Sequence, residues 1–142
     1  LASKLDDLNN TIFCITSDGE HNEGQTWEAI MSAKKFKLDN LINIIDRNNI
    51  QIDGYTKDIM PLKPLKQKYE AFGWQVITMN GHNMNQIINT LNKAKKSRRP
   101  VAIIAYTTLG KGVSLMENQP EWHGKAPNDE EKIKALEELQ NI

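Results

Sequence analysis

Two short polar segments of the sequence carry side chains that could bind a metal ion. Asp18 precedes Gly19 in the first segment, and Asn48 follows about thirty residues later in the second. Carboxylate and amide oxygens suit Mg²⁺, which neutralises the charge of a bound diphosphate. Gly19 allows the backbone to approach such a ligand, and the start of a following helix offers N–H groups to an anion. Asp-Gly and Asn-Asn are also common turn sequences, so each motif alone fits a plain turn equally well.

The sequence around these segments alternates between strand and helix patterns. Short apolar runs predict strands at 11–16, 41–46, 74–79 and 100–106. Amphipathic spacing predicts helices at 23–37, 65–72 and 83–97, with a Glu/Lys-rich helix after 128. This alternation predicts an α/β fold, a doubly wound, mostly parallel sheet with helices on both faces, in a single domain over residues 1–142.

Several residues in these elements have expected environments. The first strand is a nearly continuous apolar run, so we expect it to be covered on both faces and Cys14 to be a buried thiol. Trp27 and Trp74 are expected in the core, and Asn83 is expected to cap the helix that follows it. His21 is expected to be a solvated loop residue.

The carboxyl ends of parallel strands meet at one edge of a sheet, and ligands bind there in open α/β folds. Three polar segments reach that edge. They are 17–24 after the first strand, 46–50 after the second and 107–112 after the fourth. Their expected convergence is the reason to treat Asp18 and Asn48 as parts of one site.

The amino-acid composition argues against some classes of binding partner. The 142 residues contain 18 Lys and Arg against 18 Asp and Glu, and 39% are hydrophobic. We therefore expect no binding to nucleic acid or to a membrane, and no apolar run approaches the ~20 residues of a spanning helix. The single cysteine fits a reducing compartment, so we expect a cytoplasmic location. Because the chain starts at Leu1, we also expect it to be shortened at its N-terminus.

Longer stretches of the sequence resemble the transketolase family. The resemblance is carried by SDGEHNEGQTWEA at 17–29 and IDRNNIQIDG at 45–54. It continues in order through YEAFGW at 69–74, NGH at 80–82, GKGV at 110–113 and WHGKAP at 122–127. The last stretch is most similar to the N-terminal subunit of split, two-chain transketolases. The resemblance implies the C-terminal portion of a diphosphate-binding domain with the thiamine-diphosphate-binding fold, and thiamine diphosphate and Mg²⁺ as cofactors.

The resemblance also implies ligand roles for individual residues. Asp18, the side chain of Asn48 and the carbonyl of Ile50 would bind Mg²⁺. Gly19 and Asn48 would contact the diphosphate of the cofactor. Asn48 is chosen over Asn49 because the stretch that starts at Ile50 sets the register.

Three more residues take their expected roles from the resemblance. His123 would face the cofactor and the substrate, as a hydrogen-bond donor or as an acid/base group. Glu23 would be the buried glutamate that couples the two sites of the family's dimer. Ser17 stands where the family normally has Gly, and its Cβ would lie close to the cofactor.

The implied function is transfer of a two-carbon ketol unit between sugar phosphates, as in the pentose phosphate pathway. Upstream residues and a pyrimidine-binding domain or subunit would be needed as well, so we expect a homo- or hetero-oligomer and an inactive isolated chain. Two alternatives stay open. One is a non-catalytic transketolase-like fragment that acts as a binding or structural module, and the other is an enzyme similar to 1-deoxyxylulose-5-phosphate synthase.

Overall fold

Parallel β-strands form the centre of the first of two compact units into which the chain divides. This unit contains Leu1–Arg47 and Leu62–Thr107, and the second contains Asn48–Pro61 and the chain from Thr108 onward. The structure is a computed structural model that describes residues 1–140.

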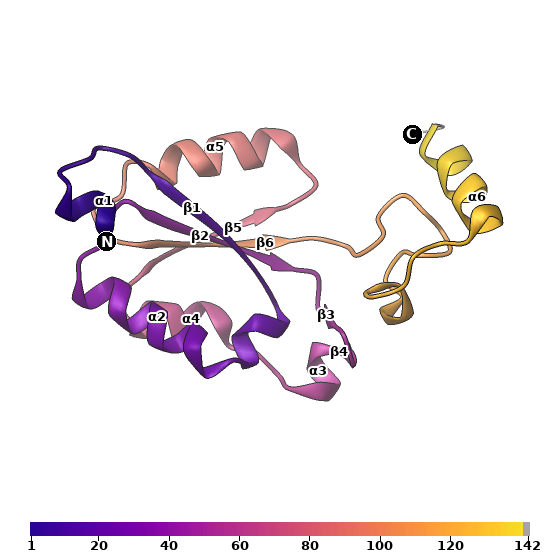
Figure 1. Ribbon diagram of the computed structural model, residues 1–142, viewed down its shortest axis with the longest axis horizontal. Coiled ribbons are helices and arrows are strands. Elements are labelled where there is room, and N and C mark those ends of the chain that lie inside the picture. The colour runs from indigo at the N-terminus through magenta and orange to yellow at the C-terminus, as the bar shows by residue number, and fades with distance from the viewer. Residues whose placement is uncertain (141–142) are drawn as a thin grey trace. The chain divides into compact units, whose positions relative to one another are not determined.

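The sheet of the first unit has the strand order β1-β2-β6-β5, and each neighbouring pair is parallel (Figure 1). Its strands are β1 (Ile12–Ser17), β2 (Leu41–Arg47), β5 (Gln75–Asn80) and β6 (Val101–Tyr106). All four lie where the sequence predicts them, and the α/β fold with a mostly parallel sheet is confirmed. The chain passes from β2 to the far edge at β5 and then returns to β6. Strand β6 therefore lies inside the sheet, and its residues 101–105 are all buried.

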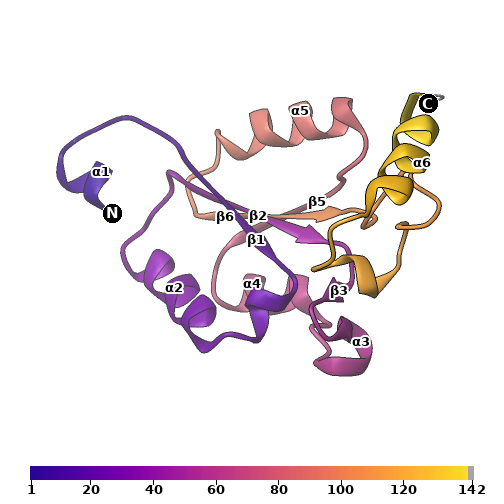
Figure 2. The same ribbon diagram turned by 45° about the vertical axis from the view of Figure 1, so that its right-hand side comes forward.

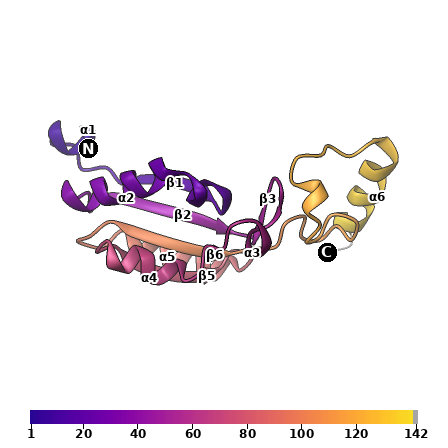
Figure 3. The same cartoon turned by 90° about the horizontal axis from the view of Figure 1, so that it is seen from below.

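Helices cover both faces of this sheet, as expected. Helices α2 (Gly24–Lys35) and α4 (Leu65–Ala71) lie side by side on one face, and α5 (Met84–Ala94) lies on the other (Figures 1 and 3). Trp74 is 3% exposed in the core beneath the first pair, and Trp27 packs against that core, as predicted. These helices therefore bury apolar residues against the sheet, as their spacing in the sequence predicts.

Helix α5 begins at the cap that the sequence predicts. The Asn83 side chain accepts a hydrogen bond from the backbone N of Gln86 at 3.0 Å. This bond satisfies one of the N–H groups that lack a partner within the helix. A four-residue helix, α1 (Ala2–Leu5), precedes β1 and was not predicted. No helix in residues 1–140 is long and apolar enough to cross a membrane.

Strand β1 has an environment that differs from the expected one. It is an edge strand, with β2 on one side and no other strand of the described residues beyond it. Ile15 is 72% exposed and Phe13 is 44% exposed on one face of the strand. Cys14, on the opposite face, is exposed as well. The predictions of a strand covered on both faces and of a buried Cys14 were therefore wrong for this chain. Neither hydrophobic cluster that the helices form with the sheet in the described residues contains a residue of β1.

The second unit contains shorter elements. An antiparallel hairpin pairs β3 (Ile50–Gln51) with β4 (Gly54–Tyr55), and α3 (Thr56–Ile59) follows directly (Figures 1 and 2). The sequence predicts only a polar loop here, because two-residue strands carry too little pattern to be recognised. Later in the unit come the 3₁₀ helix η2 (Pro120–Trp122) and α6 (Asp129–Gln140). The last of these is the Glu/Lys-rich helix expected after 128.

Candidate functional site

The turn after β1 is closed by two reciprocal hydrogen bonds. The backbone N of Ser17 donates to Glu20 Oε2 at 2.6 Å, and the backbone N of Glu20 donates to Ser17 Oγ at 3.4 Å. This is the arrangement of a capping box, in which a hydroxyl and a carboxylate three residues apart each accept from the other's N–H. The turn continues as the 3₁₀ helix η1 (Gly19–Asn22). Ser17 therefore has a structural role, and the Ser-x-x-Glu spacing was the sequence signal for it.

Asp18 is completely buried within this turn, at 0% exposure. Its Oδ2 accepts a hydrogen bond from Arg47 Nη1 at 2.6 Å, and the Arg47 side chain is 7% exposed. A carboxylate without water needs an opposite charge or hydrogen bonds to stay ionised. Arg47 provides that charge from the last residue of β2, and sequence reasoning did not assign it a role.

The ends of three strands meet beside this ion pair. Ser17 is paired in register with Asp46, and Arg47 is paired with Tyr106. Thr107 continues the contact, since its hydroxyl donates to Asp46 Oδ1 and its backbone N donates to the carbonyl of Arg47 at 3.3 Å. The polar residues of the first unit that end or follow β1, β2 and β6 therefore lie together, as the sequence predicts.

A tight turn opens the second unit. The side-chain oxygen of Asn48 accepts a hydrogen bond from the backbone N of Ile50 at 2.8 Å, which is an Asx-turn. Asn49 has a φ of 68°, a left-handed conformation that Asn tolerates better than most residues. Its carbonyl accepts from the backbone N of Thr56 at 2.9 Å. Both Asn48 and Ile50 are buried, at 6% and 1% exposure, so the predicted ligand oxygens lie in an ordered turn.

His123 follows directly on η2 in the same unit. Its Nδ1 is buried, and it has no hydrogen-bond partner within residues 1–140. The neighbouring Gly124 packs closely on the hairpin, because a Cβ there would lie 3.1 Å from Cδ1 of Ile52. Tyr55 of the hairpin also donates from its hydroxyl to the carbonyl of Asn118 at 3.0 Å. The loop of His123 and the hairpin that begins at Ile50 are therefore packed against each other.

Glu23 precedes α2, and its side chain is exposed in this chain. The burial expected from the family resemblance is therefore not produced by the described residues themselves. Gly19 is half-buried at the start of η1. Its backbone is the part of the turn that could lie closest to a ligand, because glycine has no side chain of its own.

His21 contradicts the sequence prediction of a solvated loop residue. It is 2% exposed, and its Nδ1 and Nε2 lie 2.8 Å from the carbonyl of Ser17 and 2.8 Å from the hydroxyl of Tyr69. Desolvation lowers the pKa of His21 below its ordinary value, and burial raises the pKa of Tyr69 above its own. The sequence does not reveal this, because Tyr69 is distant in the chain.

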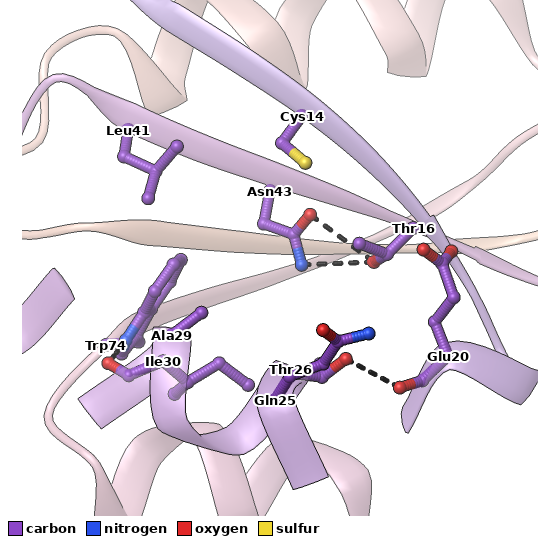
Figure 4. A pocket seen from close by; sticks show the side chains of 10 residues that line it. All are labelled: Cys14, Thr16, Glu20, Gln25, Thr26, Ala29, Ile30, Leu41, Asn43 and Trp74. Carbon is purple, nitrogen blue, oxygen red and sulfur yellow. Dashed lines mark hydrogen bonds between the residues drawn. The ribbon is translucent and has the colours of Figure 1, made fainter. Parts of the chain in front are cut away.

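A pocket of about 320 Å³ lies between β1, β2 and α2 (Figure 4). Trp74, Ile30 and Leu41 give it an apolar wall. Thr16, Asn43 and Glu20 line its polar side, as Figure 4 shows. None of the residues predicted to bind metal or cofactor lines this pocket, although Glu20 of the neighbouring turn does.

The parallel sheet with polar turns at the carboxyl ends of its strands defines an α/β protein of the class that binds ligands at this edge. The family described as "Transketolase, thiamine diphosphate binding domain" matches residues 3–140. The chain therefore belongs to the transketolase family.

Curated relatives agree with this assignment. The chain is 43% identical over 141 residues to an apulose-4-phosphate transketolase subunit from Actinobacillus succinogenes, and the match covers 99% of this chain and 51% of the relative. The 6-deoxy-6-sulfo-D-fructose transketolase subunit SqwG of a Clostridium species is also 43% identical over 141 residues, with 99% and 51% coverage. The chain thus spans about half the length of these relatives.

A solved structure supports the fold as well. The transketolase of Campylobacter jejuni superposes with a TM-score of 0.89 at 37% sequence identity. The superposition covers 98% of this chain and 22% of that one. Nearly all of the present chain therefore has the fold of the corresponding part of that transketolase.

Proposed function

We propose that this chain supplies the metal- and diphosphate-binding side of the active site of a thiamine-diphosphate-dependent transketolase. The observation that carries the proposal is the fully buried carboxylate of Asp18 in the turn after β1, in a chain of this family. The proposed reaction is the transfer of a two-carbon ketol unit between sugar phosphates. When bound, thiamine diphosphate supplies the nucleophilic carbon for such a transfer.

Asp18, the side chain of Asn48 and the carbonyl of Ile50 are the proposed Mg²⁺ ligands. The donor chemistry fits, because Mg²⁺ takes oxygen ligands and commonly uses only one or two carboxylates together with phosphate oxygens and water. Residues 1–140 contain no group of three or more His, Cys, Asp or Glu that could hold a metal alone. A site with one carboxylate that needs a phosphate to complete it agrees with that finding.

The remaining roles concern the cofactor and the substrate. Gly19 and Asn48 would contact the diphosphate through a backbone that lies close and an amide that can donate. His123 would contact the cofactor and the substrate and move a proton at a substrate oxygen. Its buried Nδ1, without a hydrogen-bond partner in the described chain, supports a role toward a ligand. Glu23 would act at a subunit contact, which its exposed side chain permits.

The proposal also includes a partner domain or subunit that completes the active site. The chain would be the C-terminal portion of a diphosphate-binding domain, and a pyrimidine-binding domain or subunit would complete the site in a homo- or hetero-oligomer. The relatives named above are described as subunits, and the chain spans about half of their length. The isolated chain is expected to be inactive, and a cytoplasmic location and a pentose phosphate pathway role remain predictions.

Reconstitution tests the proposed reaction. The full-length protein is mixed with its pyrimidine-domain subunit, thiamine diphosphate and Mg²⁺, and formation of a new ketose phosphate is followed from a ketose phosphate donor and an aldose phosphate acceptor. Transfer should require both subunits, and His123→Gln should reduce kcat by ~10²-fold or more, the usual size of an acid/base contribution. Cofactor binding without any transfer would favour the non-catalytic binding module. Lys57→Gln, at a side chain of the same unit that is 78% exposed, is the control.

A further inference from the structure

A chain of buried hydrogen bonds joins the turn of Asp18 to the core beneath α2 and α4. His21 Nδ1 lies 2.8 Å from the carbonyl of Ser17, and His21 Nε2 lies 2.8 Å from the hydroxyl of Tyr69. Asn43 on β2 then donates from Nδ2 to the same hydroxyl at 3.0 Å. Tyr69 is 0% exposed, His21 2% and Asn43 6%. The three side chains in this chain of bonds are therefore shielded from water.

The chemistry of the groups fixes where the protons lie. The carbonyl of Ser17 can only accept, so Nδ1 of His21 carries the hydrogen. Nε2 is then without a hydrogen in the neutral ring and accepts from the Tyr69 hydroxyl. That hydroxyl accepts in turn from Asn43. In this series of hydrogen bonds each donor faces an acceptor. The arrangement therefore requires one tautomer and one orientation of the His21 ring.

His21 also holds the turn from both ends. Its ring bonds to the carbonyl of Ser17 before Asp18, while its own backbone N donates to the carbonyl of Asp18 at 3.1 Å. Its carbonyl accepts from Nε1 of Trp27 on α2 at 2.9 Å. Residues 17–21 are thus tied to helix α2 through Trp27 and to α4 through Tyr69.

We propose that His21 and Tyr69 are positioning residues, which hold the Asp18–Gly19 turn in its ligand-binding conformation before a ligand arrives. The inference rests on the proposed function, since it assigns the turn to metal and diphosphate. A loop ordered in advance lowers the conformational cost of binding, and a site held by packed and hydrogen-bonded side chains keeps its geometry. Neither residue would touch the cofactor.

Amide hydrogen exchange on the full chain without ligands tests the positioning role directly. His21→Leu and Tyr69→Phe are compared with Asn83→Ala, which removes a hydrogen bond on the other face of the sheet, from the backbone N of Gln86 to Asn83 Oδ1 at 3.0 Å. Exchange of residues 18–23 should rise about tenfold or more in the first two variants and stay unchanged in the control. The ¹⁵N shifts of His21 should show the Nδ1–H tautomer in the parent chain.

A second experiment measures how the same substitutions change cofactor affinity. Thiamine diphosphate with Mg²⁺ is titrated by calorimetry into the full-length protein with its pyrimidine-domain subunit, and Tyr69→Phe should raise Kd about tenfold while Asn83→Ala does not. Exchange that stays unchanged at 18–23, or rises equally throughout the chain in all three variants, would overturn the positioning role. If the parent protein bound no cofactor, the proposed function would fail, and the exchange pattern would still decide whether the pair holds the turn.

Discussion

The guanidinium of Arg47 lies 2.6 Å from the carboxylate of Asp18, and both side chains are buried. The pair links the end of β2 to the turn that follows β1. Arg47 therefore compensates the charge of the residue that we propose as the metal ligand. Such a pair matters most when one partner is removed, because a buried charge then remains without compensation.

Arg47→Met should accordingly destabilise the protein strongly. Loss of one member of a buried ion pair typically costs about 3–5 kcal/mol, and urea unfolding measures this change. Lys66→Met is the control, because Lys66 and Glu70 form an exposed pair at 3.8 Å whose loss should cost roughly 0.5 kcal/mol or less. Equal effects of the two substitutions would show that the buried pair does not stabilise the chain.

Ser17→Ala should have a smaller, local effect. It removes the hydroxyl that accepts from the backbone N of Glu20, and loss of such a cap costs about 1 kcal/mol. Ser32→Ala, at an exposed position within α2, should change the free energy of unfolding by less than about 0.5 kcal/mol. A Ser17→Ala variant as stable as the parent would mean that the reciprocal cap contributes nothing.

Burial of His21 predicts a pH dependence of stability. Because the pKa of His21 is lowered from its ordinary value of 6.5, the unfolded chain takes up a proton at a higher pH than the folded chain does. The contribution of this residue to stability is therefore complete above about pH 7. It decreases as the pH falls below 6.5, by at most ~1.4 kcal/mol per pH unit for one proton.

Urea unfolding at several values between pH 7 and about 5.5 measures this slope. Replacement of His21 by Gln should make the slope shallower by the share of this one proton. Asn83→Ala, which removes the cap of α5 but no titratable group, should leave the slope as it is in the parent. Identical slopes in all three proteins would contradict the lowered pKa.

The exposed Cys14 gives a direct test of the edge position of β1. Its thiol should react with a disulfide reagent in the folded chain, with one equivalent released per chain and no denaturant needed. The assay is run on the chain with and without its partner subunit. A thiol that reacts only after unfolding of the chain alone would contradict the open edge, whereas protection only in the complex would place the partner on β1.

The sequence predicted those parts of the fold that depend on local pattern. Strand β6 was recognisable because its continuous apolar run matches a position inside the sheet, and α5 because Asn83 caps an amphipathic stretch. The exposure of Ile15 could not be predicted, since an apolar run looks the same in a central strand and in an edge strand. Strand order decides between the two, and it arises from contacts distant in sequence.

The same distinction between local motifs and contacts distant in the sequence applies to the candidate site. Asp18 was recognisable as a candidate from its turn motif, but its partner Arg47 was not, because only the parallel register of β1 and β2 brings the two together. The burial of His21 depends likewise on Tyr69, which reaches it through helix α4. The choice of Asn48 over Asn49 and the role of His123 came from family resemblance, and they remain predictions.

The most direct test of the central claim is calorimetric binding of thiamine diphosphate to the full-length protein with its pyrimidine-domain subunit. The parent should bind in the presence of Mg²⁺ and lose affinity after chelation of the metal or in Asp18→Asn, by at least the roughly 10- to 100-fold that loss of a group supporting a metal typically costs. Asp58→Asn, at a carboxylate whose side chain is 63% exposed, should bind like the parent. Binding that is equally tight with Asp18→Asn, or that needs no metal, would contradict the account.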